Sequence, residues 1–559
     1  MAELLVVLVA ALVVIATSAV VGPRLGIAAP LLLVAVGVGA SFLPVFAELH
    51  IEPEWILEGV LPPLLYSAAV SMPSMNFRRE FGAIGGLSVL LVVGTSLALG
   101  LFFMLVLPGI GFAWGVALGA IVSPTDAVAT SIIRKTPVSK RVVAILDGES
   151  LLNDATALVL LRTAIVATAA SFSFWGTVGT FAYSVVVAIV VGGVVGAANL
   201  AIRRRVTNPT VNTVLSFVVP FVASLPAEAL GASGLVAAVV AGLVTGIRAP
   251  RELSPQNRLS DSQNWRTVEL VLEGVVFLTM GLQLKSIVLE VERDHAGVGP
   301  AVLVAAGALA LTVLVRAAYV APLLGVLRAS ARRGERMRDR LQEMQETLAT
   351  PDGKEATLAR ANERRGPGRR TARDIERFAV RVTRSLADIE YLRRQPLGWR
   401  EGVVVVWAGM RGAVTVAAAQ TLAVGDTPQR SVLVLVAYTV AILSLLLQGG
   451  TIGFLIRRMK PTVDPAVAAA ETDAELDRVF ALLREAAAAI PEPPRPEGEP
   501  TQEQFETARS HRLSVLEAQR TALLDARDDG TFDADVLEAA LANLDAAQIA
   551  IELRGTFRG

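Results

Sequence analysis

The sequence predicts an all-α polytopic membrane protein, and three observations support this fold class. Hydrophobic residues make up 53% of the 559 residues, aromatic residues only 5%, and the mean hydropathy is +0.56. Apolar stretches of about 17 residues or more recur from Leu4 to Leu455, and each can cross a hydrocarbon core roughly 30 Å thick. A β-barrel would instead show ten-residue alternation, so we expect a helical bundle to satisfy the backbone in lipid.

About thirteen membrane-spanning helices are expected within a transport domain that covers residues 1–460. The first apolar run, Leu4 to Gly22, follows Met-Ala-Glu rather than basic residues and is too long for the apolar part of a secretory signal. We therefore interpret it as a span. The expected spans are about 3–22, 26–47, 55–72, 82–107, 109–133, 141–166, 172–201, 210–225, 231–248, 266–287, 299–327, 401–423 and 431–456.

The charged residues between these spans predict the orientation. An excess of lysine and arginine marks cytoplasmic loops, and the basic residues gather in alternate loops. We therefore expect a cell-membrane protein with its N-terminus outside and its C-terminus in the cytoplasm. The basic residues expected inside are Arg24, Arg78, Arg79, Arg134, Lys135, Lys140, Arg141, Arg203, Arg204, Arg205, Arg248 and Arg251, and the acids expected outside are Glu48, Glu52, Glu54, Glu228 and Asp426.

Two cytoplasmic regions carry opposite charge. The insertion 328–400 has 19 Lys and Arg against 11 Asp and Glu, a net charge of +8. It is expected to be a solvated, partly helical loop, or alternatively a surface for anionic lipid or a regulatory partner. The region 461–559 has 9 Lys and Arg against 20 Asp and Glu, a net charge of −11, and a Pro- and Glu-rich linker at 491–500 divides its amphipathic stretches. Docking of this acidic region on the basic insertion is a further hypothesis.

Acidic residues lie inside two neighbouring spans. A carboxylate at bilayer depth costs roughly 2.5–3.5 kcal/mol on insertion scales, which indicates a functional use. Asp126 follows Pro124 and Thr125, and the proline should break or kink its helix. A broken helix exposes carbonyls and helix ends, which bind ions in transporters. The structural alternative is a simple kink in which Asp126 caps the freed amides.

The next span places its polar residues on two helical rows. Ser150 and Asp154 are four residues apart and share a face, while Glu149 and Asn153 form the adjacent row. Asp154 lies about 140° around the helix from Glu149. We therefore expect one acid to face an ion and the other a fixed counter-charge.

Arg411, between Gly409 and Gly412, is the candidate counter-charge, and Glu149 is the partner that we predict for it. Arginine keeps its proton and so needs a permanent anion. The alternative is that Arg411 neutralises the ends of a broken helix. Residues 120–129 weakly resemble 408–417, which favours inverted repeats with two crossing broken helices.

Other site chemistries are less well supported. The chain has no cysteine, which excludes disulfides and thiolate metal sites, and its histidines (His50, His295 and His511) lie outside the expected spans. An intramembrane aspartyl protease would show a Gly-x-Gly-Asp signature, which does not occur. A channel would need a continuous pore ring rather than one deep titrating acid.

Together these motifs resemble the monovalent cation/proton antiporter family, of the sodium/proton exchanger type in its bacterial form. The resemblance covers residues 1 to about 460 and rests mainly on 148–154 and 407–414. Further matching stretches are 61–65, 123–126, 227–234, 277–282 and 448–449. It implies a homodimer of non-enzymatic transporters, each with a dimerisation domain and a moving core domain, with no cofactor, no nucleic-acid partner and a role in pH homeostasis.

The resemblance also implies roles for individual residues. Asp154 would carry the ion and the proton, and Asp126, the Thr125 backbone and Ser150 would complete the oxygen shell of a sodium ion. Glu149 and Arg411 would form the stabilising pair, and Asn153 beside Asp154 resembles the electroneutral branch. This chain has Ser67 where many relatives carry an acid, which places a ligand contact and the ion selectivity in question.

These roles imply a mechanism in which cation and proton compete. Burial favours the neutral form of a carboxyl, and so does a neighbouring acid. Asp154 is then either protonated or bound to sodium or lithium, and one proton exchanged for one cation moves no net charge. A potassium/proton antiporter is the main alternative, because both cations take oxygen ligands.

Overall fold

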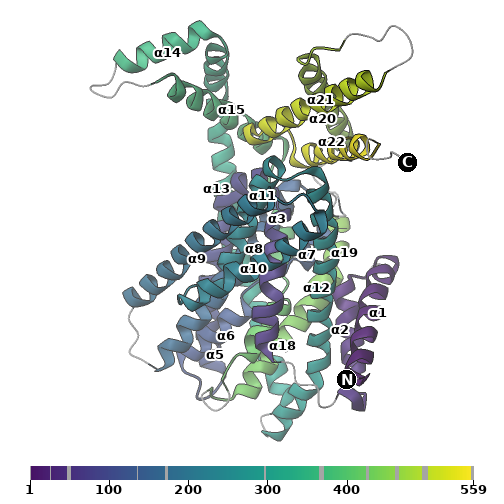
Figure 1. Ribbon diagram of the computed structural model, residues 1–559. Helices are drawn as coiled ribbons and strands as arrows, with labels where there is room; N and C mark the ends of the chain where they lie inside the picture. The colour runs from purple at the N-terminus through teal and green to yellow at the C-terminus, as the bar shows by residue number, and fades with distance from the viewer. Residues whose placement is uncertain are drawn as a thin grey trace. The chain divides into compact units, whose positions relative to one another are not determined.

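The computed structural model describes residues 2–25, 27–46, 52–134, 136, 138–169, 174–294, 297–363, 371–423, 427–459, 465–493 and 501–554, and every regular element within these ranges is a helix (Figure 1). The expectations for Glu48, His50, Lys135, His295, Asp426 and most of the linker 491–500 fall outside the described residues.

The chain divides into two compact units, and the first contains the expected spans. This membrane unit comprises Met1–Leu323 and Gly398–Thr462. Its helices are α1 (Ala2–Leu25), α2 (Ala29–Ala40), η1 (Pro44–Phe46), η2 (Trp55–Val60), α3 (Leu61–Ser71), α4 (Ser74–Gly85), η3 (Gly86–Leu91), α5 (Val92–Val106), α6 (Phe112–Val122), α7 (Val128–Ile133), α8 (Lys140–Ala169), α9 (Phe174–Arg203), α10 (Pro209–Ala229), α11 (Gly234–Glu252), α12 (Pro255–Arg293), the first half of α13 (Val298–Ala349), α16 (Trp399–Trp407), α17 (Ala413–Gln420), α18 (Arg430–Ser444), η4 (Leu445–Gly449) and α19 (Gly450–Met459).

Each expected span contains between one and three helical segments. Within the described ranges, nine helices are long and apolar enough to cross a membrane, and three apolar helices are shorter: Ala29–Ala40, Trp55–Ser71 and Phe112–Val122. Two expected spans, 109–133 and 401–423, are each interrupted after a short first helix. Thirteen crossings and the inverted repeat therefore stay predictions, while the all-helical membrane fold is confirmed.

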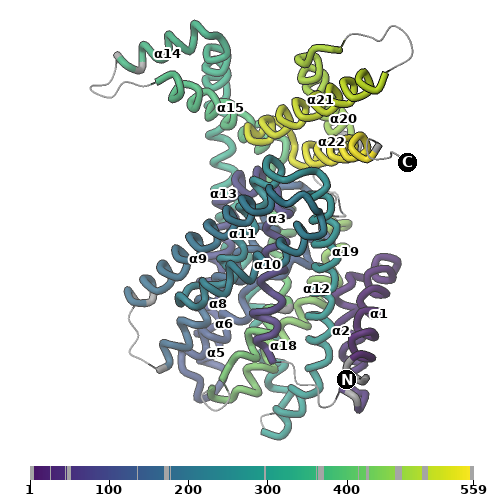
Figure 2. The backbone as a smooth tube through the Cα atoms, in the orientation of Figure 1, coloured from purple at the N-terminus to yellow at the C-terminus, as the bar shows by residue number. Residues whose placement is uncertain are grey.

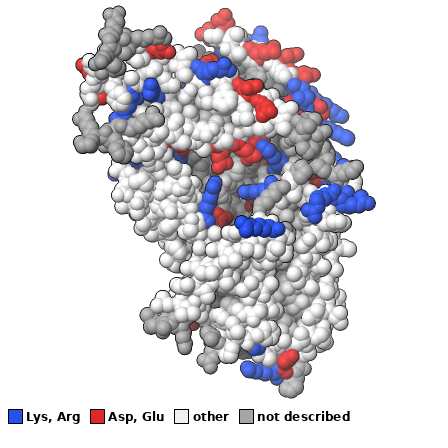
Figure 3. All heavy atoms as spheres, turned by 90° about the vertical axis from the view of Figure 1, so that its right-hand side faces the viewer, with Lys and Arg blue, Asp and Glu red and all other residues white. Residues whose placement is uncertain are grey.

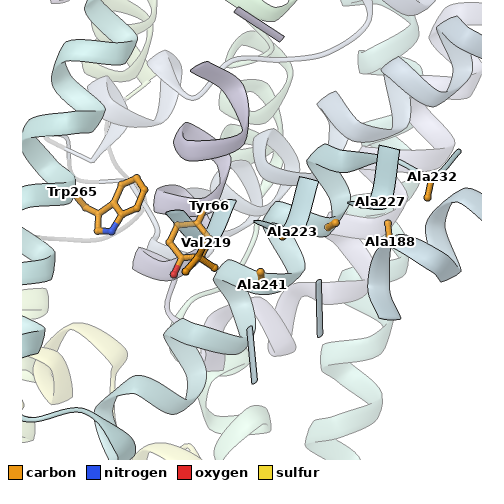
Figure 4. Packing of buried hydrophobic residues seen from close by; sticks show 9 residues of the cluster. Tyr66, Ala188, Val219, Ala223, Ala227, Ala232, Ala241 and Trp265 are labelled. Carbon is orange, nitrogen blue, oxygen red and sulfur yellow. The ribbon is translucent and has the colours of Figure 1, made fainter. Parts of the chain in front are cut away.

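Small residues allow the membrane helices to approach closely. Gly37 of α2 faces Gly281 of α12, and a Cβ on Gly281 would lie 2.3 Å from the Val34 carbonyl oxygen. Helices α1 and α2 therefore lie directly beside α12 (Figure 2). A second tightly packed group joins α3, α9, α10, α11 and α12. It contains the rings of Tyr66 and Trp265, whose centroids are 5.2 Å apart, and alanines of α9, α10 and α11 (Figure 4).

The surface of the membrane unit suits a lipid environment. Figure 3 shows a broad band of this unit without Lys, Arg, Asp or Glu side chains. Large apolar side chains are exposed on the surface of the membrane unit, among them Leu105, Val190, Leu303 and Leu314. Since transfer of these groups to water is unfavourable, the exposed band matches the hydrocarbon layer that the sequence predicts.

Two arginines that the sequence analysis assigned to cytoplasmic loops are buried in ion pairs. The Arg141 Nε atom lies 2.6 Å from a Glu80 carboxylate oxygen, and both side chains are almost fully buried. Arg203 pairs with Asp261 and also donates to the Asn212 side chain at 2.8 Å. These charges hold helices together, so the surface excess of basic residues is smaller than the sequence count suggested.

The second unit combines the insertion with the C-terminal region. It comprises Leu324–Leu397 and Val463–Gly559, with the second half of α13 and helices α14 (Pro351–Glu363), α15 (Ala372–Arg394), α20 (Pro465–Ala488), α21 (Gln502–Asp529) and α22 (Ala534–Arg554). The basic and acidic segments meet at Arg384–Asp529 (3.8 Å) and Arg394–Glu475 (3.9 Å). Partly exposed ion pairs of this kind are worth about 0–1 kcal/mol each, so the apolar cores within the unit carry most of its stability.

Candidate functional site

The two helix interruptions lie against each other. The first separates α6 from α7 at residues 123–127 and contains Pro124, and the second separates α16 from α17 at residues 408–412. The Asp126 N–H donates to the Met410 carbonyl at 2.7 Å, and the Arg411 Nε–H donates to the Val122 carbonyl at 3.0 Å. Backbone groups freed by one break are thus satisfied by the other.

Gly412 makes room for the side chain of Asp126. A Cβ at position 412 would lie only 1.4 Å from an Asp126 carboxylate oxygen. The remaining Asp126 oxygen accepts a hydrogen bond from the Val128 N–H, the first residue of α7, at 3.3 Å. The carboxylate therefore sits at a helix N-terminus, where the backbone dipole favours negative charge.

For the exchange activity that the family resemblance implies, we predict that Gly412→Ala greatly reduces transport, because the added methyl displaces the Asp126 carboxylate. Transport by purified protein in liposomes measures the effect. Gly450→Ala is the matched control, since a Cβ at position 450 has no atom within 4 Å. Equal activity of the two variants would contradict the assigned position of Asp126.

A hydrogen-bonded row connects α8 to the first break. The Asn153 side-chain amide donates to the Thr125 carbonyl at 3.0 Å and to the Thr125 hydroxyl oxygen at 2.7 Å. The Thr125 hydroxyl in turn donates to a Glu149 carboxylate oxygen at 3.1 Å. Glu149 and Asn153 therefore act from one row of α8, as their spacing predicted, and they hold the break in place.

Glu149 pairs with Arg316 of α13, so the predicted pairing with Arg411 is wrong. Arg316 binds both Glu149 carboxylate oxygens, one of them at 2.7 Å, and its Nε–H donates to the Val405 carbonyl at 2.9 Å. Both side chains of the pair are almost completely buried. Arg316 is the only charged residue in the expected span 299–327, the same signal that singled out Arg411.

Arg411 lies within the second break and binds backbone oxygen atoms. The Arg411 side chain donates to the carbonyls of Val122 and Gly409, and the Arg411 backbone N–H donates to the Ser444 hydroxyl at 2.9 Å. A permanent cation here compensates the negative C-terminal end of α6. This arrangement is the structural alternative that the sequence left open for Arg411.

Asp154 is not part of this hydrogen-bonded network. It is 8% exposed, and no described residue forms a hydrogen bond with its carboxylate. The charge that acts on it is that of Asp126. A buried carboxylate without a hydrogen-bond donor is unfavourable unless it takes up a proton or a cation.

The other predicted ligands are placed less directly. Ser150 is half-buried, and its hydroxyl donates to the Asp147 carbonyl at 3.1 Å within α8. Ser67 of α3 is buried, and its hydroxyl lies 3.4 Å from a Glu269 carboxylate oxygen. An acid therefore does lie next to position 67, but α12 supplies it. Among the described residues, no group of three or more Asp, Glu or His is arranged to hold a metal ion. Besides Asp154 and Asp126, a further acid lies near the site, because the Asp126 charge also acts on Glu273 of α12; the sequence did not single out this residue.

Comparison with known sequences gives a family match over most of the chain. The family model described as "Sodium/hydrogen exchanger, transmembrane" matches residues 7–342 and 377–458. An uncharacterized Na(+)/H(+) exchanger of Escherichia coli strain K12 is 32% identical over 299 residues, which cover 51% of this chain and 54% of that protein. The Na(+)/H(+) antiporter ApNhaP of Aphanothece halophytica is 28% identical over 258 residues, covering 45% of this chain and 49% of the relative. The chain thus spans about half the length of these relatives.

Comparison with solved structures gives the same fold. The sodium proton antiporter MjNhaP1 from Methanocaldococcus jannaschii matches with a TM-score of 0.54 and 16% sequence identity, over 81% of this chain and 98% of that chain. At this identity the similarity concerns the fold alone.

Proposed function

Since this chain belongs to the sodium/hydrogen exchanger family, we propose that it exchanges sodium or lithium for protons across the cell membrane by alternating access. The observation that carries the proposal is Asp154, a buried carboxylate without a hydrogen-bond donor beside a second acid. Such a group is stabilised either by a proton or by a cation, and each occupant excludes the other.

The surrounding groups support a site that keeps its shape while its occupant changes. Thr125 is held by Asn153 and Glu149, and the Glu149 charge is balanced by Arg316. Asp126 is fixed against the second break through its N–H. Asp154 is then the group whose charge changes, with Asp126, the Thr125 backbone and Ser150 as further oxygen ligands of the transported ion.

Ion-dependent dissipation of a pH gradient tests the proposed function. Purified protein in liposomes with an acidic interior should raise the internal pH when sodium or lithium is added outside, and the rate should saturate. Potassium at the same concentration should give a smaller response. A linear, non-saturating flux that needs no pH gradient would indicate a channel, and a response to potassium alone would refute sodium exchange.

We predict that the exchange is electroneutral, because the charge of one bound cation equals that of one proton on Asp154. Asn153 cannot ionise, so the pair 153–154 carries one titrating carboxyl rather than two. The initial rate should be the same when a potassium–valinomycin clamp sets the membrane potential to zero or to an inside-negative value. A rate that depends on the clamped potential would refute one-to-one exchange.

The topology and assembly that we propose follow from the sequence. The alternation of basic and acidic loops supports an outside N-terminus and a cytoplasmic C-terminus. The family resemblance supports a homodimer embedded in lipid. The insertion and the acidic C-terminal region would then form a cytoplasmic unit.

A further inference from the structure

The membrane helix that follows the second break carries a row of polar residues. This helix runs from α18 through the π-helical turn η4 into α19, and Ser444, Gln448 and Thr451 follow one another by four and three residues. These spacings place the three side chains on one face. The Ser444 hydroxyl accepts a hydrogen bond from the Arg411 N–H at 2.9 Å. The Thr451 hydroxyl accepts one from the Trp407 Nε1–H at 2.9 Å. The row therefore lies along the segment that contains the second break.

Gln448, in the middle of this row, is buried without a protein partner. It is only 2% exposed, and no described residue forms a hydrogen bond with its amide nitrogen or its amide oxygen. A primary amide offers two donors and an acceptor oxygen, and a buried amide that uses none of them is unfavourable. The break is close by, since a Cβ on the adjacent Gly449 would lie 3.1 Å from the Met410 sulfur. Gln448 therefore requires a small polar molecule beside it.

The end of α16 supplies further polar groups without partners. A helix ends with four carbonyls that have no partner within it. Two of these four accept hydrogen bonds, from the Ala408 N–H at 2.8 Å and from the Arg316 Nε–H at 2.9 Å. No described residue donates to the last two, the carbonyls of Val406 and Trp407. Acceptors without donors thus occur at the helix end that the Gln448 row contacts.

Water is the small molecule that fits these groups. An anion is excluded because it would face carbonyl oxygens. A cation is disfavoured because the Arg411 guanidinium lies in the same break. A water molecule can donate to the free carbonyls while it accepts from the Gln448 amide, and buried waters typically make about three such bonds.

We propose that Gln448 binds a buried water at the end of α16 and is thereby a positioning residue of the ion site. The water fixes the segment between Trp407 and Arg411. Within that segment, the Met410 carbonyl accepts the hydrogen bond from the Asp126 N–H at 2.7 Å. Gln448 acts on the transported cation through Asp126 rather than by contact. The positioning role rests on the proposed exchange function, whereas the water site does not.

Radiolytic footprinting tests the water site. X-ray pulses split water into hydroxyl radicals, which oxidise nearby methionine sulfur to the sulfoxide. Met410 is fully buried, so its rapid oxidation in the purified natural protein requires a water inside the break. Gln448→Leu should slow the oxidation of Met410 several-fold. Met280, which is equally buried, is the internal reference and should react at the same rate in both proteins.

Two footprinting results would overturn the water site. One is a natural protein in which Met410 is not oxidised, and this result needs no variant. The other is equal oxidation of Met410 in the natural protein and in a folded Gln448→Leu.

Transport kinetics test the positioning role. Gln448→Leu should raise the KM for sodium by roughly fivefold, which is the equivalent of one hydrogen bond, and should change the maximal rate less. A role in packing alone would lower the amount of folded protein and leave the KM unchanged. Leu446→Ala is the matched control on the same helical turn, because Leu446 is 57% exposed, and it should keep the natural KM. An unchanged KM in Gln448→Leu would overturn the positioning role.

The two experiments separate this inference from the proposed function. If the natural protein shows no sodium-dependent proton movement, the exchange function fails, and footprinting still decides whether the break holds water. If exchange is intact but Gln448→Leu behaves like its control in both experiments, only this inference fails.

Discussion

Asp154→Asn is expected to abolish sodium-dependent proton movement while the protein remains folded in the membrane. Asparagine keeps the size of the side chain but can neither bind a proton nor supply a full negative charge to a cation. Both half-reactions of the exchange would be lost together. The measurement is sodium-driven dissipation of a pH gradient in liposomes, with the amount of inserted protein determined for each preparation.

The stability of the same variant separates loss of function from misfolding. The Asp154 carboxylate has no hydrogen-bond donor among the described residues, so its removal leaves no partner unsatisfied. We expect the melting temperature in detergent to be unchanged or higher. Asp147→Asn is the matched control on α8, since Asp147 pairs with the exposed Arg134, and it should retain exchange. An active Asp154→Asn would refute the assignment of the carrier.

Local signals in the sequence predicted the helix breaks and the rows of α8. Pro124 removes a backbone donor and favours a break, and glycines at 409 and 412 weaken the second helix in a similarly local way. Pro220 and Pro226, however, lie within the uninterrupted helix α10. The position of Asn153 beside Glu149 follows from helical geometry alone. The rows of α8 depend on neighbours within four residues, so no tertiary information is needed to place them. The breaks are favoured locally and are completed by the hydrogen bonds between the two interruptions.

The partner of Glu149 could not be predicted in this way. Two lone arginines, Arg316 and Arg411, occupy different expected spans, and either could neutralise an acid on α8. Which one does so depends on how α13 and α16 pack against α8, and that packing involves contacts between residues far apart in the sequence. The same limit applies to Ser67, whose neighbouring acid, Glu269, comes from another helix. It also applies to the second unit, which joins two segments separated by the last membrane helices.

Breaking the Glu149–Arg316 pair should have the second large effect, on stability as well as on transport. Glu149→Gln leaves the Arg316 charge buried without an anion, and Arg316→Met leaves the Glu149 carboxylate buried without a cation. Loss of one partner of a buried pair costs about 3–5 kcal/mol. By comparison, Arg393→Met removes an exposed pair with Glu390, and solvent screening leaves such a pair little effect on stability. In thermal unfolding of purified protein in detergent, Glu149→Gln and Arg316→Met should therefore lower the melting temperature much more than Arg393→Met does.

A double-mutant cycle identifies the true partner of Glu149. If Arg316 neutralises Glu149, the double variant Glu149→Gln with Arg316→Met should lose less free energy of unfolding than the sum of the two single losses. The difference, the coupling energy, should be about 1–3 kcal/mol. The same cycle with Arg411→Met should show much weaker coupling, because Arg411 binds backbone carbonyls instead. The stabilised double variant should still transport poorly, since Thr125 loses the charged acceptor that holds the first break. Stronger coupling of Glu149 to Arg411 than to Arg316 would restore the pairing that the sequence predicted and refute the one described above.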